Sequence, residues 1–177
     1  PRDNHAREQI RLIDMDDICV TNINRQLPAM SGTIGKLKTE VMSERVKLIN
    51  PECTINIIDD FISPENQSDY LNRGYDYVID AIDNVKTKAS LIAYCKRNKI
   101  NVITIGGAGG QTDPTQIQIA DLSKTIQDPL LAKVRSVLRK DYNFSQNPKR
   151  KFSIDAVFST QPLIFPQMTE GCSISAT

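Results

Sequence analysis

The fold is decided by residues 77–105, which read YVIDAIDNVKTKASLIAYCKRNKINVITI. This stretch opens with a short apolar run that is typical of a strand. Val85, Ala89 and Ile92 then recur at the three- and four-residue steps of an amphipathic helix. A second β-branched run, residues 101–105, closes the stretch. Strand, helix and strand in this order predict a parallel sheet with covered faces.

The same alternation continues on both sides of this stretch. The elements predicted before it are a strand at 10–14, a helix with one buried side at 36–49, a strand at 54–58 and a short helix at 63–74 capped by Ser63. The elements predicted after it are a strand at 115–121, a helix that begins at Asp128-Pro129 and a strand at 152–160. Residues 115–121 alternate between apolar and polar, which favours an antiparallel strand. No structure is predicted from Gln161 onward.

Composition fits one globular α/β domain over residues 1–177. The chain has 22 Lys and Arg against 21 Asp and Glu, and 40% of it is hydrophobic. Its apolar runs are all shorter than the roughly 18 residues of a membrane span. The four cysteines, Cys19, Cys53, Cys95 and Cys172, stand singly, which excludes a CxxC zinc clamp and a dense disulfide framework. We therefore expect a cytoplasmic protein. We also expect Cys95 to pack on the inner side of its helix and to have no catalytic role.

The net charge of +1 conceals a basic segment. Between Lys124 and Lys151 there are eight bases and two acids. Two interpretations stay open, a phosphate-binding surface and a solvated helix face with its loop. The bases that would carry the first are Lys133, Arg135, Arg139, Lys140, Lys149, Arg150 and Lys151.

Polar side chains at the carboxyl ends of parallel strands are the leading site candidates, because ligands bind there in such sheets. Asp14 ends one predicted strand, and Asp83 with Asn84 follows another. Asp14 is placed to accept hydrogen bonds from a ribose, or else caps a helix or is solvated. Lys38 lies in the first turn of the 36–49 helix, where an ammonium and free backbone N–H groups suit a polyphosphate. A solvated lysine is the alternative.

Four segments in this order resemble the ubiquitin-activating-like (ThiF/MoeB/HesA) adenylyltransferases. They are LIDMD at 12–16, TNINRQ at 21–26, GKLK at 35–38 and DAIDN at 80–84. Within that superfamily the sequence most resembles the tRNA threonylcarbamoyladenosine dehydratases. The segments that carry this likeness are 79–83, 93–100, 106–111, 113–118, 124–130 and 157–160, so that it runs from about Leu12 to Gln167. The resemblance implies a Rossmann-like, mostly parallel sheet with helices on both faces, mixed by antiparallel strands in its C-terminal part.

The resemblance also implies roles for individual residues. ATP would be bound by Asp14 at the ribose hydroxyls, Asn22 and Arg25 at the phosphates, Lys38 at the departing pyrophosphate, Asp83 through Mg²⁺, and Asn84, which would orient the nucleotide. Of these, Arg25, Lys38 and Asp83 would be catalytic. The enzyme would adenylate the carboxylate of threonylcarbamoyladenosine in a tRNA and close a ring with net loss of water. Such an attack within one modification needs no protein nucleophile.

Partners follow from the same likeness. The basic segment would hold tRNA phosphates while Tyr142, Phe144 or Phe152 stacks on an exposed base. We expect a homodimer, sulfur-transfer accessory proteins as for some relatives, and no DNA partner. The glycines of 106–110 are interpreted as a tight turn that lets the backbone approach substrate or partner subunit, because they do not form GxGxxG.

The chain departs from the family at both ends. The family's strand, glycine-rich loop and helix before Asp14 are absent, as is its C-terminal region, which can associate with membranes. We therefore expect a fragment or a degraded variant that binds ATP poorly by itself. Two other functions are alternatives. One is adenylation of a ubiquitin-like sulfur carrier, which paired CxxC motifs would favour. The other is a nicotinamide dehydrogenase or inert nucleotide-binding module, which needs none of Arg25, Lys38 and Asp83.

Overall fold

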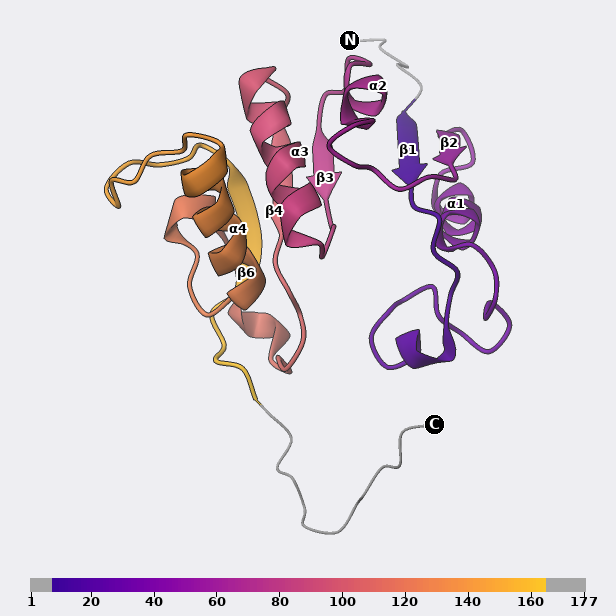
Figure 1. Ribbon diagram of the computed structural model, residues 1–177. Helices are drawn as coiled ribbons and strands as arrows, with labels where there is room; N and C mark the ends of the chain where they lie inside the picture. The colour runs from indigo at the N-terminus through magenta and orange to yellow at the C-terminus, as the bar shows by residue number, and fades with distance from the viewer. Residues whose placement is uncertain (1–7, 165–177) are drawn as a thin grey trace, which may run out of the picture. The chain divides into compact units, whose positions relative to one another are not determined.

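The computed structural model describes residues 8–164, which form two compact units. The first ends at Ile62 and the second begins at Ser63. Figure 1 colours the first unit from indigo to purple and the second from magenta to yellow. The single domain proposed for 1–177 stays a prediction, since both of its ends lie outside the described residues.

The first unit is a β-α-β arrangement. β1 (Gln9–Ile13) and β2 (Thr54–Ile58) pair in parallel along their whole length, from Gln9 with Thr54 to Ile13 with Ile58. α1 (Lys38–Ile49) precedes β2 in the chain and packs against both strands. A 3₁₀ turn, η1 (Val20–Asn22), lies in the loop between β1 and α1. The predicted strands at 10–14 and 54–58 are thus confirmed.

The buried side predicted for the 36–49 helix is only partly correct. The helix begins at Lys38, and Val41 is buried with Ile18 and Ala29 in a small core. In the last turn, however, Leu48 is 86% exposed and Ile49 is 75% exposed. Two strands offer a narrow apolar surface, so a twelve-residue helix finds too little to cover its full length.

The second unit has a four-stranded mixed sheet. Its order is β3 (Val78–Asp80), β4 (Val102–Ile105), β6 (Asp155–Ser159) and β5 (Ile117–Asp121). The first three strands are parallel, and β5 runs antiparallel to β6. The predicted mostly parallel sheet with an antiparallel C-terminal strand is therefore confirmed. The last strand is shorter than the predicted 152–160.

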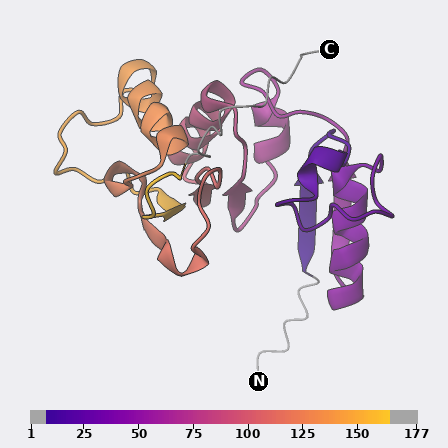
Figure 2. The same cartoon turned by 90° about the horizontal axis from the view of Figure 1, so that it is seen from below.

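The described part of this unit, residues 63–164, has three helices: α2 (Gln67–Leu71), α3 (Val85–Arg97) and α4 (Pro129–Asp141). α3 and α4 lie side by side, as Figures 1 and 2 both show. α3 buries Ala89 and Ile92, and α4 buries Leu131, Val134 and Leu138. Two 3₁₀ turns, η2 (Pro114–Gln116) and η3 (Leu122–Lys124), flank β5. No helix among residues 8–164 is long and apolar enough to cross a membrane.

The short helix predicted at 63–74 begins later, at Gln67. Ser63 Oγ accepts hydrogen bonds from the backbone N–H groups of Glu65 and Asn66, as a cap would. Asn66 Oδ1 in turn accepts from Ser63 N at 2.7 Å. This reciprocal pairing closes a separate turn, so the helix starts only after Asn66.

One face of the second sheet is rich in isoleucine and open. The register places Ile79 beside Ile103 and Ile105 beside Val157, and Ile119 also pairs with Val157. Ile79 is 70% exposed and Ile119 is 67% exposed. The opposite face is buried under α3 and α4, at Thr104 and Ala156 among others. We call the open side the isoleucine face.

Candidate functional site

Asp14 lies where the sequence predicts, directly after β1. Its backbone N–H still bonds to Ile58 O at 3.3 Å, so the residue sits at the carboxyl end of a parallel strand. Its carboxylate is half-buried, and Oδ1 accepts a hydrogen bond from Asp16 N at 2.9 Å. The carboxylate thus shapes the turn that follows the strand.

Lys38 is the first residue of α1 and contacts that same turn. Its Nζ forms an ion pair with Asp16 Oδ2 at 2.7 Å, and its backbone N donates to Asp16 O at 3.0 Å. The structure therefore brings Asp14 and Lys38 together through Asp16. Sequence reasoning missed Asp16, although the acidic run Asp14-Met15-Asp16-Asp17 was a signal for it.

Asn22 and Arg25 belong to the loop around η1. Asn22 is buried, and its Oδ1 accepts from Cys19 N at 3.1 Å, which caps the 3₁₀ turn. Arg25 is exposed, and its Nη1 donates to Thr21 O at 2.8 Å and to Asn24 Oδ1 at 3.0 Å. These two bonds hold the guanidinium against its own loop.

Asp83 and Asn84 are exposed in the second unit, between β3 and α3. Asn84 caps α3, since its Oδ1 accepts from the backbone N–H groups of Lys86 and Thr87, each at 3.1 Å. The first unit therefore carries Asp14, Asn22, Arg25 and Lys38, and the second carries Asp83 and Asn84. Their convergence on one triphosphate stays a prediction.

A buried ion pair supports the Asp83 turn from below. Lys88 Nζ lies 3.1 Å from Asp80 Oδ2, and both side chains are fully buried. Burial raises the pKa of Asp80 and lowers the pKa of Lys88, while the attraction between the two charges opposes both shifts. Sequence reasoning missed Lys88, although a lysine three residues after Val85 on an apolar stripe was a signal.

The glycine loop after β4 approaches a carboxylate of its own chain. Asp128 is buried, and its Oδ2 accepts from Gly107 N at 2.9 Å. A Cβ on Gly106 would lie 1.9 Å from the same oxygen. At Gly106 the backbone closely approaches the Asp128 carboxylate, and an approach of this loop to substrate or partner subunit stays a prediction.

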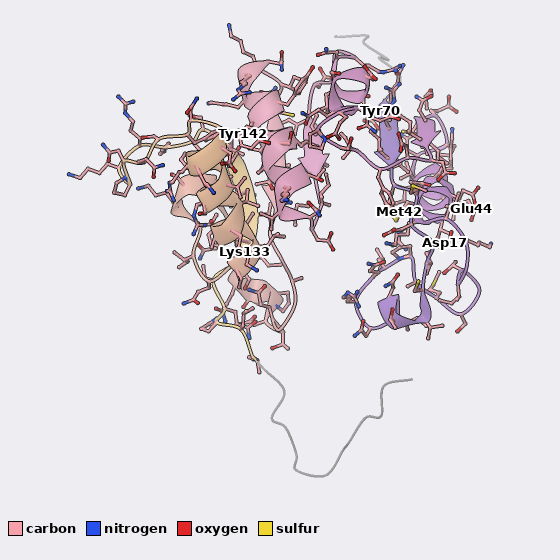
Figure 3. All side chains as sticks on the ribbon, in the orientation of Figure 1. Asp17, Met42, Glu44, Tyr70, Lys133 and Tyr142 are labelled. Carbon is pink, nitrogen blue, oxygen red and sulfur yellow. The ribbon has the colours of Figure 1, made fainter. Side chains whose placement is uncertain are left out.

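The basic segment divides into exposed and packed cations. Arg135 donates to Thr125 Oγ1, and Arg139 lies over the Phe152 ring, 5.2 Å from its centroid. Figure 3 shows Lys133 on α4 and nitrogen-tipped side chains on the loop beyond Tyr142. Of the seven bases predicted to bind phosphates, the exposed ones are Lys133, Lys140, Lys149, Arg150 and Lys151.

The prediction that Phe152 stacks on a base is wrong. Its side chain is only 3% exposed, and Phe144 packs edge-on against it with centroids 4.9 Å apart. Arg97 lies over the Tyr142 ring at 5.7 Å. These aromatic rings pack at the end of α4, because burying an apolar ring lowers the free energy relative to leaving it exposed to water.

Cys95 is fully buried on the inner side of α3, as predicted. Burial, and next the negative charge of Asp80, raise the pKa of its thiol to about 12. Within residues 8–164 no group of three or more His, Cys, Asp and Glu side chains is placed to hold a metal ion.

Comparison with known proteins places this geometry in a family. A Haemophilus influenzae protein named tRNA threonylcarbamoyladenosine dehydratase is 97% identical over 96% of this chain and 65% of its own length. An Escherichia coli protein of the same name is 56% identical over 95% of this chain and 63% of its own length. The crystal structure of the E. coli dehydratase TcdA in complex with ATP matches with a TM-score of 0.85 and 57% identity, covering 89% of this chain and 65% of that chain.

The chain thus spans less than two thirds of the curated relatives that it matches. The sequence model of the ThiF family matches residues 7–159, which is most of the chain. The mixed α/β fold described above agrees with the structural match to TcdA. The chain therefore belongs to the ThiF family.

Proposed function

We propose that this protein is an ATP-dependent tRNA-modifying enzyme that adenylates the carboxylate of threonylcarbamoyladenosine and cyclises it with net loss of water. The observation that carries the proposal is the 97% identity to the H. influenzae dehydratase over almost the whole chain. The likeness to TcdA in complex with ATP supports ATP as the co-substrate. Adenylation of a sulfur carrier is not favoured, because the relatives at 97% and 56% identity are named dehydratases.

In this proposal the first unit binds the nucleotide. Asp14 accepts hydrogen bonds from the ribose hydroxyls at the end of β1. Asn22 and Arg25 contact the phosphates from the η1 loop. Lys38 combines its ammonium with the positive end of α1, which favours a polyphosphate. The ion pair with Asp16 holds Lys38 in place until phosphate oxygens replace that partner.

The first chemical step opposes two anions. A carboxylate oxygen attacks the α-phosphorus, a new P–O bond forms, and the bond to pyrophosphate breaks. Arg25 offsets the repulsion with a planar, bidentate donor set, and Lys38 stabilises the charge that leaves with pyrophosphate. Fixed cations of this kind act where charge develops, which lowers the barrier.

Asp83 is suited to hold Mg²⁺ with help from ATP. It is an exposed carboxylate beyond the carboxyl end of β3, and Asn84 beside it would orient the nucleotide. One carboxylate with phosphate oxygens and waters is a usual set for Mg²⁺. When bound, the ion neutralises phosphate charge during transfer. The donor chemistry present therefore fits the ion.

The second step needs no protein nucleophile. An atom within the same modification attacks the acyl carbon, the C–O bond to AMP breaks, and a ring closes. The proximity of the two groups gives a high effective concentration. Cys95 is consistent with this proposal, because a buried thiol with a pKa of about 12 is a poor nucleophile at neutral pH.

We further propose that tRNA phosphates bind the exposed cations of α4 and the following loop. Single-stranded loops and phosphates are the usual targets of such surfaces. A homodimer and sulfur-transfer accessory proteins remain part of the proposal, as does a cytoplasmic reaction, since tRNA is there. The exposed cations concerned are Lys133, Lys140, Lys149, Arg150 and Lys151.

The test is a mass measurement on the modified nucleoside. The full-length protein is incubated with ATP, Mg²⁺ and tRNA that carries threonylcarbamoyladenosine, and the tRNA is then digested. We expect the nucleoside mass to fall by one water, with AMP and pyrophosphate released. An unchanged mass together with ATP binding would leave a nucleotide-binding module, and the proposed reaction would be refuted.

Lys38→Ala should abolish most turnover while the fold stays intact. Loss of one such stabilising cation costs about 10²- to 10³-fold in rate. The matched control is Lys36→Ala, which removes an exposed lysine two residues earlier, and we expect it to retain the parent rate. Circular dichroism checks the fold of both variants. Equal rates for the two variants would remove Lys38 from the catalytic set.

A further inference from the structure

The buried Lys88 uses all three ammonium hydrogens on groups of the β3–α3 turn. Its Nζ donates to Asp80 Oδ2 at 3.1 Å, to Asp80 O at 3.2 Å and to Ile82 O at 2.9 Å. An ammonium has three donors, so this environment satisfies it fully. Two of the three acceptors are backbone carbonyls. The side chain therefore fixes main-chain positions as well as pairing with a charge.

Asp80 is held from the other side by the neighbouring strand. Its Oδ2 accepts from Thr104 Oγ1 of β4 at 2.7 Å, and its Oδ1 accepts from Ile82 N at 3.1 Å. The cluster of Asp80, Lys88 and Thr104 thus ties β3, β4 and α3 together beneath one turn. We call it the Lys88 cluster.

Asp83 lies between two points that Lys88 holds. The Lys88 side chain binds the carbonyl of Ile82, the residue before Asp83. The Lys88 backbone N donates to Asn84 O, the residue after it, at 2.9 Å. The second of these is the i→i−4 bond of α3, so what the side chain adds is the fixing of Ile82, directly before the carboxylate that is proposed to carry Mg²⁺.

Stability alone does not account for this lysine. Taking two charges out of water costs more than a well-packed apolar pair of similar size, and such a replacement is often neutral or stabilising. Ala89 and Ile92 on the same helix are fully buried apolar residues. What an apolar residue cannot supply is three hydrogen bonds to the turn.

We propose that Lys88 is a positioning residue: it places Asp83 and Asn84 for Mg²⁺ and ATP and does not itself contact the metal ion or the nucleotide. This inference rests on the proposed function for the role of Asp83. Its test is the double variant Asp80→Asn with Lys88→Met in the full-length protein, which removes both charges and keeps the volumes. Lys88→Met by itself would leave the buried Asp80 carboxylate without a partner, so that a loss of stability could not be separated from a displaced turn.

Two readouts are measured on this variant. The first is the dependence of the dehydration rate on Mg²⁺ concentration at saturating ATP. We expect the half-saturating concentration to rise by about 10- to 100-fold, as for the loss of a residue that orients a metal ligand. The second is hydrogen exchange in a peptide spanning residues 80–86, which we expect to be faster than in the parent, with exchange in β6 unchanged.

The control is Asp121→Asn in the same sheet. Asp121 accepts hydrogen bonds from Ser123, Phe152 and Ser153, so its loss disturbs a comparable carboxylate network on another strand. We expect this variant to keep the parent's Mg²⁺ dependence. If the double variant does not fold, Thr104→Val replaces it and should shift both readouts in the same direction by less.

The two proposals fail in different ways. A parent protein that leaves the tRNA mass unchanged refutes the proposed function, yet faster exchange over residues 80–86 in the variant would still support the positioning role. Parent-like Mg²⁺ dependence and parent-like exchange in a folded variant would overturn the positioning role and leave the proposed function standing.

Discussion

Cys95 and Cys19 place the same thiol in opposite surroundings. Cys95 lies buried on the inner side of α3, whereas Cys19 is exposed in the loop after β1. With a pKa of about 12, the Cys95 thiol is ionised in about 10⁻⁴ of molecules at pH 8, and alkylating reagents attack only the thiolate. Reactivity at these two positions therefore reports burial and charge together.

We expect iodoacetamide at pH 8 to modify Cys19 quickly and to leave Cys95 unmodified in the folded protein. In urea both should react, because unfolding restores an ordinary thiol pKa. Peptide mapping by mass spectrometry separates the two sites. Labelling of Cys95 at a rate near that of Cys19 would mean that α3 does not pack as described.

The sequence was informative about single residues where burial follows from periodicity. The helical spacing from Val85 through Ile92 placed Cys95 inside, and that prediction is confirmed. The place of Lys88 on the apolar stripe of this helix indicates burial, but a pattern of apolar residues does not name the partner of a buried charge. Only the fold brings Asp80 and Thr104 to the lysine. The fold also brings Phe144 and Arg139 onto the Phe152 ring, so its burial could not be predicted from the sequence.

At the scale of elements, the first residue of a helix depends on whether the capping side chain bonds to N–H groups of the helix or to those of a separate turn. Asp128 was predicted to begin α4, and its Oδ1 does accept from Leu131 N at 2.8 Å. Ser63 offers the same chemistry, but its bonds close an isolated turn with Asn66. Local spacing fits both outcomes, so the sequence could predict the existence of each helix better than its first residue.

Gly106→Ala should destabilise the second unit, and Gly109→Ala should not. A Cβ at Gly106 would displace the Asp128 carboxylate that caps α4 and would press on Leu131 Cδ1 at 3.2 Å. We expect the free energy of unfolding to fall by about 1–3 kcal/mol. Gly109 has open space around it and should change by less than about 0.5 kcal/mol. Urea unfolding followed by circular dichroism compares them, and equal midpoints would contradict the close approach.

At the scale of the whole molecule, alternation of strand and helix predicted the fold class, and the likeness to TcdA bears it out. Register, strand order and the side of each sheet that stays open were not predictable. They depend on pairings between distant segments, such as β4 with β6, which lie about fifty residues apart. The meeting of Arg25, Lys38 and Asp83 is a long-range arrangement of this kind and stays a prediction.

Charge reversal of the exposed α4 lysines tests the tRNA surface. Arg139 is a poor target because it packs over Phe152, so we choose Lys133→Glu with Lys140→Glu. We expect weaker tRNA binding, an unchanged KM for ATP, and a salt dependence of binding that falls by about one unit of slope for each lysine removed. Filter binding at several salt concentrations measures this.

The matched control is Arg45→Glu with Lys47→Glu, which makes the same charge change on α1 in the first unit. It should bind tRNA more tightly than the α4 variant. Indistinguishable affinities for the two variants would show that net charge matters and that the α4 surface does not.

The isoleucine face has a practical consequence for handling this polypeptide. Ile79, Ile105 and Ile119 present branched hydrocarbon to water across several adjacent strands. The attraction between such surfaces strengthens with warming and with sulfate, and it weakens in the cold. A solution of this polypeptide should accordingly stay clear on ice and become turbid at room temperature as the exposed faces associate. Ammonium sulfate should precipitate it for the same reason, which makes salt precipitation a suitable purification step and room-temperature storage an unsuitable one.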